Sequence, residues 1–352
     1  MLELGYIDEA KGVLDFWWNK FKVFGDLYNA EGMDNDNSRL LFINDEVENT
    51  GYLLMCFFNY FEHTKDKEYI DEVFPLLKWA FEIQLPHIAG DMLEFSCDET
   101  YIAGGTFPKN LMYHGSAEAT LLFIEGGERF LNYARIEKLL PEEKIAGYYE
   151  VVSNVRKNFK KNFFDDGILY ANNPLREKIA GRPQFRHGFC DAEEILDKHL
   201  SLSWTEKNDK NYFVCPKCRE RKMPEMTNCD KRYILNSVNL ALKYHNTTLF
   251  TDEEIQKIIS DCITAFENTN RVPSNPGSTR SLGYDYGLML YNAAKLNLSI
   301  KDNVLAKTLD LLDSSGAWVE YYDNDIPFNC RCRTWESSIN IEGIIEYIRN
   351  II

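Results

Sequence analysis

Residues 46–63, EVENTGYLLMCFFNYFEH, decide the fold class because their apolar side chains repeat with the period of an α-helix. Their spacing is i, i+3, i+4, i+7 and i+8, which places on one helix face the residues Leu53, Cys56, Phe57, Tyr60 and Phe61. Residues 255–266 repeat with the same period, whereas alternating strand patterns are scarce. The sequence therefore predicts an all-α protein.

Helix start signals support this interpretation. Residues 251–254, TDEE, and residues 299–302, SIKD, are both typical of a capping box, and Pro141 followed by two glutamates is typical of a first helical turn. Together with the periodic runs, these signals predict about ten helices. They lie near residues 7–28, 46–63, 67–85, 115–136, 141–161, 231–246, 252–268, 284–297, 301–313 and 335–350.

The connections between these helices alternate in length. Short connections join successive pairs, and long ones are predicted at residues 29–45, 86–114, 162–230, 269–283 and 314–334. In a ring of helical hairpins all long connections emerge at the same end, where they form the natural binding cleft. Every unusual cluster of residues falls in a long connection, which predicts one functional face.

Composition excludes several classes of function. The chain has 352 residues and a formal net charge of -16, so nucleic acid and anionic membranes are poor partners. We find no linker-like stretch, which predicts a single domain over residues 1–352 with a cysteine-rich insert at about 162–230. No apolar run reaches the roughly 18 to 20 residues that span a bilayer. The first residues do not resemble a signal peptide, and the nine cysteines are odd in number, so we expect a cytoplasmic, reducing setting.

The connection at residues 90–110, GDMLEFSCDETYIAGGTFPKN, contains a pair of adjacent carboxylates, Asp98 and Glu99. A carboxyl group beside apolar and like-charged neighbours has a raised pKa, as a general acid that works near neutral pH requires. The alternative is a solvated pair or a helix-capping acid.

A second carboxylate, Glu320, lies within residues 316–348, GAWVEYYDNDIPFNCRCRTWESSINIEGIIEYI, among Trp318, Tyr321 and Tyr322. It is suited to activate a water molecule beside a stacked sugar, although a structural hydrogen-bond acceptor is the alternative. Glycoside hydrolysis requires two such carboxyl groups on opposite sides of the scissile bond. The two acids together therefore indicate this chemistry more strongly than either acid alone.

These segments resemble motifs of the glucoamylase and glucodextranase type of glycoside hydrolases, whose fold is an (α/α)6 toroid. Residues 43–54, INDEVENTGYLL, resemble the element that opens one inner helix. Residues 97–107, CDETYIAGGTF, are similar to the segment that carries the general acid. Residues 319–323, VEYYD, and residues 333–338, RTWESS, are similar to the segment that carries the general base and the tryptophan that follows it. The order of the motifs matches over residues 1–350.

The resemblance implies roles for individual residues. Glu99 would be the general acid, with Asp98 as the alternative, and Glu320 would be the general base, with Glu336 in reserve. The expected sugar-binding residues, two of them (Arg280 and Tyr284) taken from a turn-rich loop rather than from the resemblance, are Asp45, Tyr101, Arg280, Tyr284, Trp318, Trp335 and Glu336.

The chain also departs from the family pattern. The family ring has twelve helices, whereas this sequence begins with what resembles the third, so the first hairpin is absent. We expect either an upstream segment or a partner chain to complete the ring, or a loss of activity. Cys97 replaces the tryptophan that precedes the acid pair in the family, which places substrate stacking there in question.

The insert contains a Cys-Pro-Lys-Cys turn, which can direct two thiolates at one metal ion. The expected ligands of a structural zinc are Cys190, Cys215, Cys218, Cys229 and His187. Free thiols, redox chemistry or a catalytic metal are the alternatives. No cofactor is expected for catalysis.

We therefore predict an inverting glycoside hydrolase that acts on an oligosaccharide or glycoconjugate. A sugar phosphorylase, epimerase or lyase on the same toroid is the first alternative. The second is a non-catalytic, zinc-stabilised scaffold that binds a glycan or a protein.

Overall fold

The computed structural model of the protein describes residues 2–25, 27, 30–31, 39–40, 45–95, 114–180, 185–186, 213–214, 221–222, 225–226, 231–331 and 334–352. The chain divides into two compact units. Unit 1 consists of Met1–Asn162 and Asn172–Arg232, and unit 2 consists of Phe163–Ala171 and Tyr233–Ile352. The prediction of one domain over the whole chain stays a prediction.

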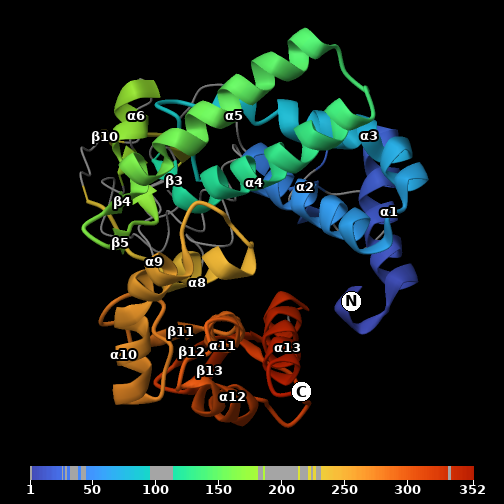
Figure 1. The fold of residues 1–352 in the computed structure, drawn as a ribbon. Helices are drawn as coiled ribbons and strands as arrows, with labels where there is room; N and C mark the ends of the chain where they lie inside the picture. Colours follow the sequence, from blue (N-terminus) through green and yellow to red (C-terminus); the bar gives the residue numbers. More distant parts are fainter. Residues whose placement is uncertain are drawn as a thin grey trace. The chain divides into compact units, whose positions relative to one another are not determined.

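Unit 1 is built from helices (Figure 1). They are α1 (Ile7–Phe24), α2 (Asp45–Thr64), α3 (Lys67–Glu82), α4 (Ala117–Ile136), α5 (Glu142–Phe163, which ends one residue into unit 2) and the short α6 (Leu175–Ala180), with 3-10 turns at Leu2–Leu4 and Leu85–His87. Two-residue strands pair in antiparallel fashion: β1 (Ala30–Glu31) with β2 (Arg39–Leu40), β3 (Gly115–Ser116) with β6 (Asn172–Asn173), β7 (Phe185–Arg186) with β10 (Glu225–Met226), and β8 (Phe213–Val214) with β9 (Arg221–Lys222).

Side-chain caps and aromatic packing define the centre of unit 1. Asp66 accepts a hydrogen bond from the amide of Tyr69 at the start of α3, and Ser116 caps α4 in the same way. Caps of this kind satisfy amides that lack a partner within the helix. Between α3 and α4, Phe81 stacks on Phe123 and Phe130 with ring centroids 5.5 and 5.0 Å apart.

Helices α2 and α4 run in the same direction. Near their N-terminal ends Gly51 approaches the side chain of Leu122, and further along Leu54 approaches Gly126. Contacts that advance together along both helices require parallel axes. The first residues of α2 and of α4 therefore lie at the same end of the pair.

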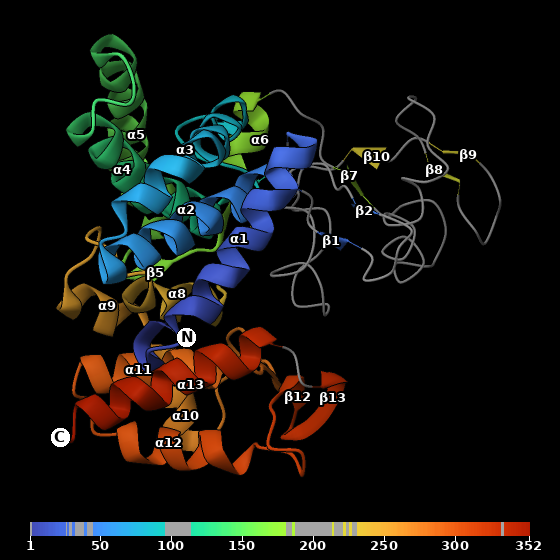
Figure 2. The same cartoon turned by 90° about the vertical axis from the view of Figure 1, so that its right-hand side faces the viewer.

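Unit 2 combines helices with one three-stranded sheet (Figure 2). The helices are α8 (Asn236–Tyr244), α9 (Asp252–Ile258), α10 (Ser260–Thr269), α11 (Asp285–Lys295), α12 (Lys301–Asp310) and α13 (Thr334–Arg349). The sheet has the antiparallel order β11 (Arg280–Leu282), β12 (Val319–Asp323) and β13 (Ile326–Arg331), and a separate hairpin joins β4 (Phe164–Asp165) to β5 (Ile168–Leu169).

Helices α11 and α13 also run parallel, because Glu336 near the start of α13 approaches Gly283 just before α11, and Glu346 near the end of α13 pairs with Lys295, the last residue of α11. They touch through glycine. A Cβ atom on Gly287 would lie 2.5 Å from Cα of Asn340, and one on Gly343 would lie 2.5 Å from the carbonyl oxygen of Gly287. Real Cβ atoms do not approach backbone so closely, so only glycine permits this crossing. The first turns of α11 and α13 therefore share one end of unit 2.

All ten predicted helices are present, with four differences in detail. The capping box at Thr251 forms, because its side chain and that of Glu254 bond to each other's backbone amides. The one predicted at residues 299–302 is wrong: α12 begins after Ile300 without a side-chain cap, and Asp302 instead accepts a hydrogen bond from Tyr347.

The other three differences are one interrupted helix, one additional helix and the strands of a sheet. The helix predicted at 252–268 is interrupted at Ile259, α6 lies inside the predicted connection 162–230, and the connections 269–283 and 314–334 contain the sheet of unit 2. The strands were missed because residues 319–322 are buried on both faces, so they lack the alternation that reveals a half-buried strand.

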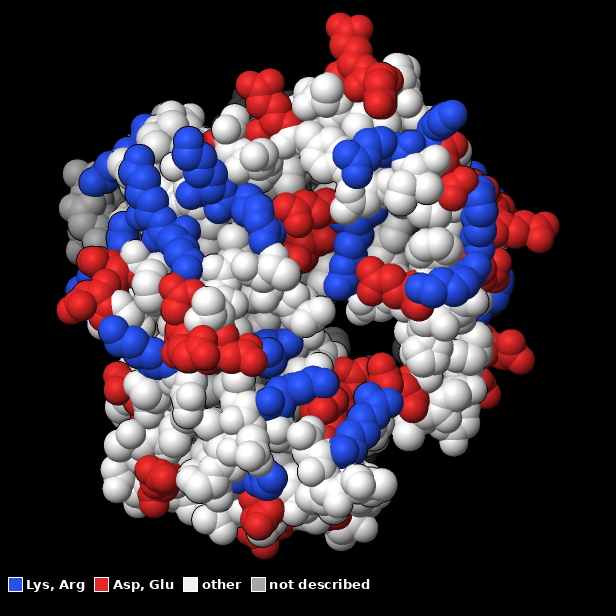
Figure 3. All heavy atoms as spheres, in the orientation of Figure 1, with Lys and Arg blue, Asp and Glu red and all other residues white. Residues whose placement is uncertain are grey.

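None of the described helices has the length and apolar composition that a membrane crossing requires. On the face shown in Figure 3, Lys and Arg side chains are interspersed with Asp and Glu side chains. The excess of acidic residues therefore does not form one continuous acidic surface on that face.

Candidate active site

The predicted base, Glu320, is the second residue of β12 and only 8% exposed. Its carbonyl oxygen accepts a hydrogen bond of 2.8 Å from the amide of Gly283, which follows β11. Strand pairing with β11 therefore positions its backbone on one side, while on the other side the register between β12 and β13 is irregular between Val319 and Tyr321. The side chain thus comes from a rigid element instead of the predicted loop.

Gly283 also brings the reserve base, Glu336, to the same place. A Cβ atom on Gly283 would lie 2.9 Å from Cγ of Glu336, and Asn340 donates a hydrogen bond of 2.9 Å to the carbonyl oxygen of Gly283. Glu336 is in the first turn of α13 and is completely buried. Gly283 therefore lies against two acids: the backbone of Glu320 and the side chain of Glu336.

A third buried acid, Asp285, opens α11 two residues after Gly283 and is also completely buried. The negative charges act on neighbouring groups. Burial raises the pKa of the Cys262 thiol, and the charge of Asp285 raises it further. Burial likewise raises the pKa of Tyr322, with a smaller contribution from Glu336. This part of unit 2 therefore combines burial with acids, and both raise the pKa of neighbouring groups.

The aromatic residues around Glu320 differ in exposure. The indole of Trp318 is buried and donates a hydrogen bond of 2.8 Å to the carbonyl oxygen of Thr308 in α12. The hydroxyl of Tyr322 donates to the carbonyl oxygen of Leu311. These two side chains hold β12 against the end of α12. Trp335, which begins α13 together with Thr334, is 40% exposed.

The two remaining predicted sugar contacts in unit 2 lie near the same end. Arg280 is the first residue of β11 and pairs with Asp323, and Tyr284 is the residue before α11. Both side chains are half-buried. Sugar contact by Arg280 and Tyr284 stays a prediction, and so does sugar contact by Trp318 and Trp335.

In unit 1, an acid that sequence reasoning missed lies in the first turn of α4. Glu118 is buried, and the hydroxyl of Tyr52 in α2 donates a hydrogen bond to its Oε1. Burial raises the pKa of Glu118 to about 8, although the hydrogen bond from Tyr52 opposes the rise. The carboxyl is therefore protonated at neutral pH, which is the state that a proton donor needs.

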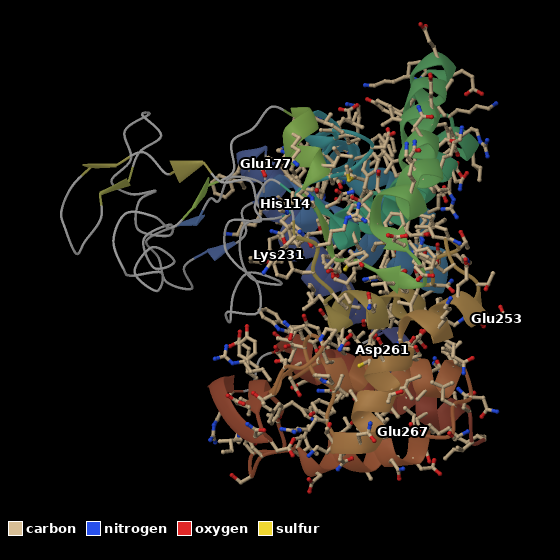
Figure 4. All side chains as sticks on the ribbon, turned by 90° about the vertical axis from the view of Figure 1, so that its left-hand side faces the viewer. His114, Glu177, Lys231, Glu253, Asp261 and Glu267 are labelled. Carbon is tan, nitrogen blue, oxygen red and sulfur yellow. The ribbon has the colours of Figure 1, made fainter. Side chains whose placement is uncertain are left out.

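A second group in unit 1 joins α6 to the strand before α4. Figure 4 shows His114 and Glu177 side by side, and Nε2 of His114 lies 3.4 Å from Oε2 of Glu177. Beside them, Arg176 is buried and forms a 2.7 Å ion pair with Oε2 of Glu94, whose Oε1 lies 2.6 Å from Nδ1 of His87. None of these residues is among the site residues that the sequence predicts.

The remaining predicted site residues cannot be placed. Glu99, Asp98 and Tyr101 lie outside the described residues, and so do all five predicted zinc ligands. Asp45 is the first residue of α2, but its side chain is not described. Among the described residues, no group of three or more His, Cys, Asp or Glu side chains could hold a metal ion.

Glu118 and Glu177 were missed for a physical reason. An acid in the first helical turn is ordinary, because it interacts favourably with the helix dipole, so the sequence around Glu118 indicates only a helix start. Glu177 lies in a six-residue helix with no apolar period. In both cases burial distinguishes the residue, and burial depends on distant segments.

Comparison with protein-family models and with curated protein sequences finds no match. Solved structures do resemble the chain in fold. A wild-type glycosidase aligns over 98% of this chain and 80% of its own length, with 10% identity and a TM-score of 0.55. A variant glycosidase in complex with glucose aligns over the same shares, with 10% identity and a TM-score of 0.54.

Two further enzymes of known structure have a similar fold. The neutral trehalase of Saccharomyces cerevisiae aligns over 98% of this chain and 70% of its own, with 12% identity and a TM-score of 0.52. A rhamnosidase from Klebsiella oxytoca with rhamnose bound aligns over 93% and 51%, with 11% identity and a TM-score of 0.51. The predicted all-α fold is thus confirmed: the chain has the fold of the (α/α)6 toroid glycosidases.

Proposed function

We propose that this protein is a glycoside hydrolase that cleaves an oligosaccharide or glycoconjugate with inversion at the anomeric carbon. The observation that carries the proposal is the fold shared with glycosidases along 98% of the chain. Unit 2 supports it, because Glu320, Glu336 and Asp285 are buried acids on adjoining elements, β12, α13 and α11.

In the proposed mechanism, Glu320 is the general base. It removes a proton from a water molecule, which attacks the anomeric carbon while Glu99, or Asp98 in its place, protonates the departing oxygen. Inverting enzymes hold their two carboxyl groups roughly 6.5 to 9.5 Å apart so that the water fits between base and sugar.

Glu336 is the alternative base, since it approaches the same glycine as Glu320. The two candidates differ in exposure, because 8% of the surface of Glu320 is exposed to solvent and none of that of Glu336 is. A base must reach a water molecule, so we assign the role to Glu320. Glu336 would then contribute to the negative potential that favours a developing oxocarbenium ion.

The substrate panel follows from the sugars named for the structures of the same fold. Glucose and rhamnose were bound in two of them, and trehalose is the substrate of a trehalase. We therefore define a sugar panel of glucose, rhamnose and trehalose for binding, with the aryl glycosides of the first two sugars for turnover.

The decisive experiment compares wild type with Glu320→Gln on this panel. Loss of the base should lower the hydrolysis rate by about 10²-fold or more. Asp323→Asn is the matched control, because Asp323 lies three residues further along β12 and is half-exposed. It should retain wild-type activity. Proton NMR of the first product would report whether the anomeric configuration inverts.

Other outcomes point to the alternatives. Full activity in Glu320→Gln, Glu336→Gln and Glu99→Gln would contradict the hydrolase mechanism. Turnover that depends on inorganic phosphate would indicate a phosphorylase. Sugar binding without turnover would indicate a non-catalytic scaffold.

We also propose a structural zinc at Cys190, Cys215, Cys218 and either Cys229 or His187, based on the Cys-Pro-Lys-Cys turn. Metal analysis of purified protein should find about one zinc per chain, and none in Cys215→Ser/Cys218→Ser. Completion of the ring by an upstream segment or a partner chain likewise stays a proposal.

A further inference from the structure

Glu177 in unit 1 has an unusual hydrogen-bonding state. The residue is 6% exposed, and its Oε1 atom is buried without a hydrogen-bond partner in the described part of the chain. Most buried carboxylate oxygens accept at least one hydrogen bond, because an unsatisfied acceptor loses its hydration and gains nothing in return. The free oxygen of Glu177 therefore needs a donor that the described chain does not supply.

The other oxygen is held by a fixed histidine. The amide Nδ2 of Asn172 lies 2.9 Å from Nδ1 of His114, and an amide nitrogen can only donate. Nδ1 is thus the acceptor, so Nε2 carries the hydrogen, and it lies 3.4 Å from Oε2 of Glu177. The pairing of Ser116 with Asn172 in β3 and β6 holds this group together. His114 and Asn172 therefore orient the carboxylate.

Arg176, the neighbour of Glu177 in sequence, anchors α6 without neutralising Glu177. Its guanidinium donates to Oε2 of Glu94 at 2.7 Å and to the carbonyl oxygens of Met92 and His87. Glu94 thus has a partner at each oxygen, since Oε1 lies 2.6 Å from His87. Two buried acids of one unit differ: Glu94 is satisfied by protein groups, and Glu177 is satisfied at one oxygen only.

The position of Glu177 suits a ligand. His114 follows residues 96–113, the segment that carries the predicted acid, and the two ends of that segment are joined because Glu94 pairs with Gly115. A carboxylate that is oriented by the protein at one oxygen and lacks a donor at the other is suited to accept a hydrogen bond from a sugar hydroxyl.

We propose that Glu177 is a substrate-binding residue whose Oε1 accepts a hydrogen bond from a hydroxyl of the bound sugar, and that His114 is its positioning residue. This inference rests on the proposed function, because the ligand is the sugar of the hydrolase.

The test measures sugar binding and stability in the full chain. Titration calorimetry with each sugar of the panel gives the affinity, and thermal unfolding gives the stability of the free protein. Glu177→Gln keeps an acceptor for His114 and removes the charge. We expect its affinity to fall on the order of ten- to hundredfold. Its melting temperature should be unchanged or higher, because a buried, half-satisfied carboxylate disfavours the free protein.

Glu128→Gln is the matched control. Glu128 lies on α4 and is paired with Arg156, so its replacement removes an ion pair of unit 1 away from the proposed contact. It should bind sugar like wild type. Glu177→Asp and His114→Gln should each weaken binding, because the first withdraws the carboxylate and the second removes its orienting group.

The results separate the inference from the proposed function. Wild-type affinity in Glu177→Gln, with or without a lower melting temperature, would show a structural glutamate and overturn the inference, while hydrolysis by the wild type would leave the proposed function intact. If the wild type neither binds nor cleaves any sugar of the panel, both fail. Weaker binding by Glu177→Gln, with normal binding by the control, supports the inference.

Discussion

Three buried acids of unit 1 and three of unit 2 are held in different ways. In unit 1, Glu94, Glu118 and Glu177 each face a donor from another element: Arg176 bonds to Glu94, Tyr52 to Glu118, and His114 lies against Glu177. In unit 2, Asp285 and Glu336 begin two parallel helices, and Glu320 pairs through its backbone with the glycine that Glu336 touches.

The difference indicates a division of labour. Donors that hold a carboxyl in one orientation or keep it protonated suit substrate binding and proton donation. Several acids gathered at one place produce a negative potential, which suits the activation of water and the stabilisation of positive charge. The comparison therefore predicts how substitutions act in each unit. In unit 1 a substitution should act by removing the hydrogen-bond or ion-pair partner of a buried acid. In unit 2 it should act by moving the acids or by changing the charge around them.

The largest effect is expected at Arg176, the fully buried cation of unit 1. Arg176→Met removes the partner of Glu94 and leaves a buried charge and two carbonyl oxygens without their donor. The free energy of unfolding should fall by about 3 to 5 kcal/mol. Urea denaturation followed by tryptophan fluorescence measures it.

The double variant Arg176→Met/Glu94→Leu removes the stranded charge as well. It should recover a large part of the loss, since an apolar pair can replace a buried ion pair. If the double variant is no more stable than Arg176→Met, the ion pair is not what anchors α6, and the contrast between the units is lost.

The next effect concerns pH. The pKa of Glu118 is about 8 in the folded protein against an ordinary value of 4.5, so the folded state binds the extra proton between these values. The stability from the protonated form is fully present below pH 4.5 and is lost as the pH rises through the folded pKa. Between pH 5 and 8 the loss should be on the order of 3 kcal/mol.

Glu118→Gln should remove this part of the pH dependence. Chemical denaturation of the variant and of the wild type at several pH values measures the difference in slope. Equal slopes in Glu118→Gln and wild type would show that the carboxyl is already ionised at neutral pH, and Glu118 would then no longer be a protonated acid.

A smaller effect is expected at Gly283 in unit 2. Gly283→Ala places a Cβ atom 1.9 Å from the carbonyl oxygen of Val319 and 2.9 Å from Cγ of Glu336. The resulting shift should destabilise the protein by about 1 to 3 kcal/mol. It should also displace Glu320 and Glu336, so the hydrolysis rate of the folded variant should fall in addition to the loss of stability.

Gly147→Ala is the opposite case. Gly147 lies inside α5 with no atom within 4 Å of the added Cβ, so the same substitution should stabilise the protein by about 0.5 to 1 kcal/mol. Equal behaviour of the two variants would mean that space around Gly283 does not limit the position of the acids.

Local patterns in the sequence determined most of the helices, because the apolar period and the capping signals act within a few residues. The capping box at Thr251 shows this, since both of its hydrogen bonds lie within four residues. At residues 299–302 the same pattern failed, because Asp302 bonds to Tyr347 of α13, a residue that no local signal could identify.

The candidate site divides in the same way. The sequence indicated Glu320 and Glu336 through motifs, but only the tertiary structure decided that both approach Gly283 and that Glu118 and Glu177 are buried. Whether an acid is a solvated surface group or a protonated, oriented one depends on burial and on partners from distant segments such as Tyr52 and His114. Those are properties of packing between helices, which the sequence around the acid does not contain.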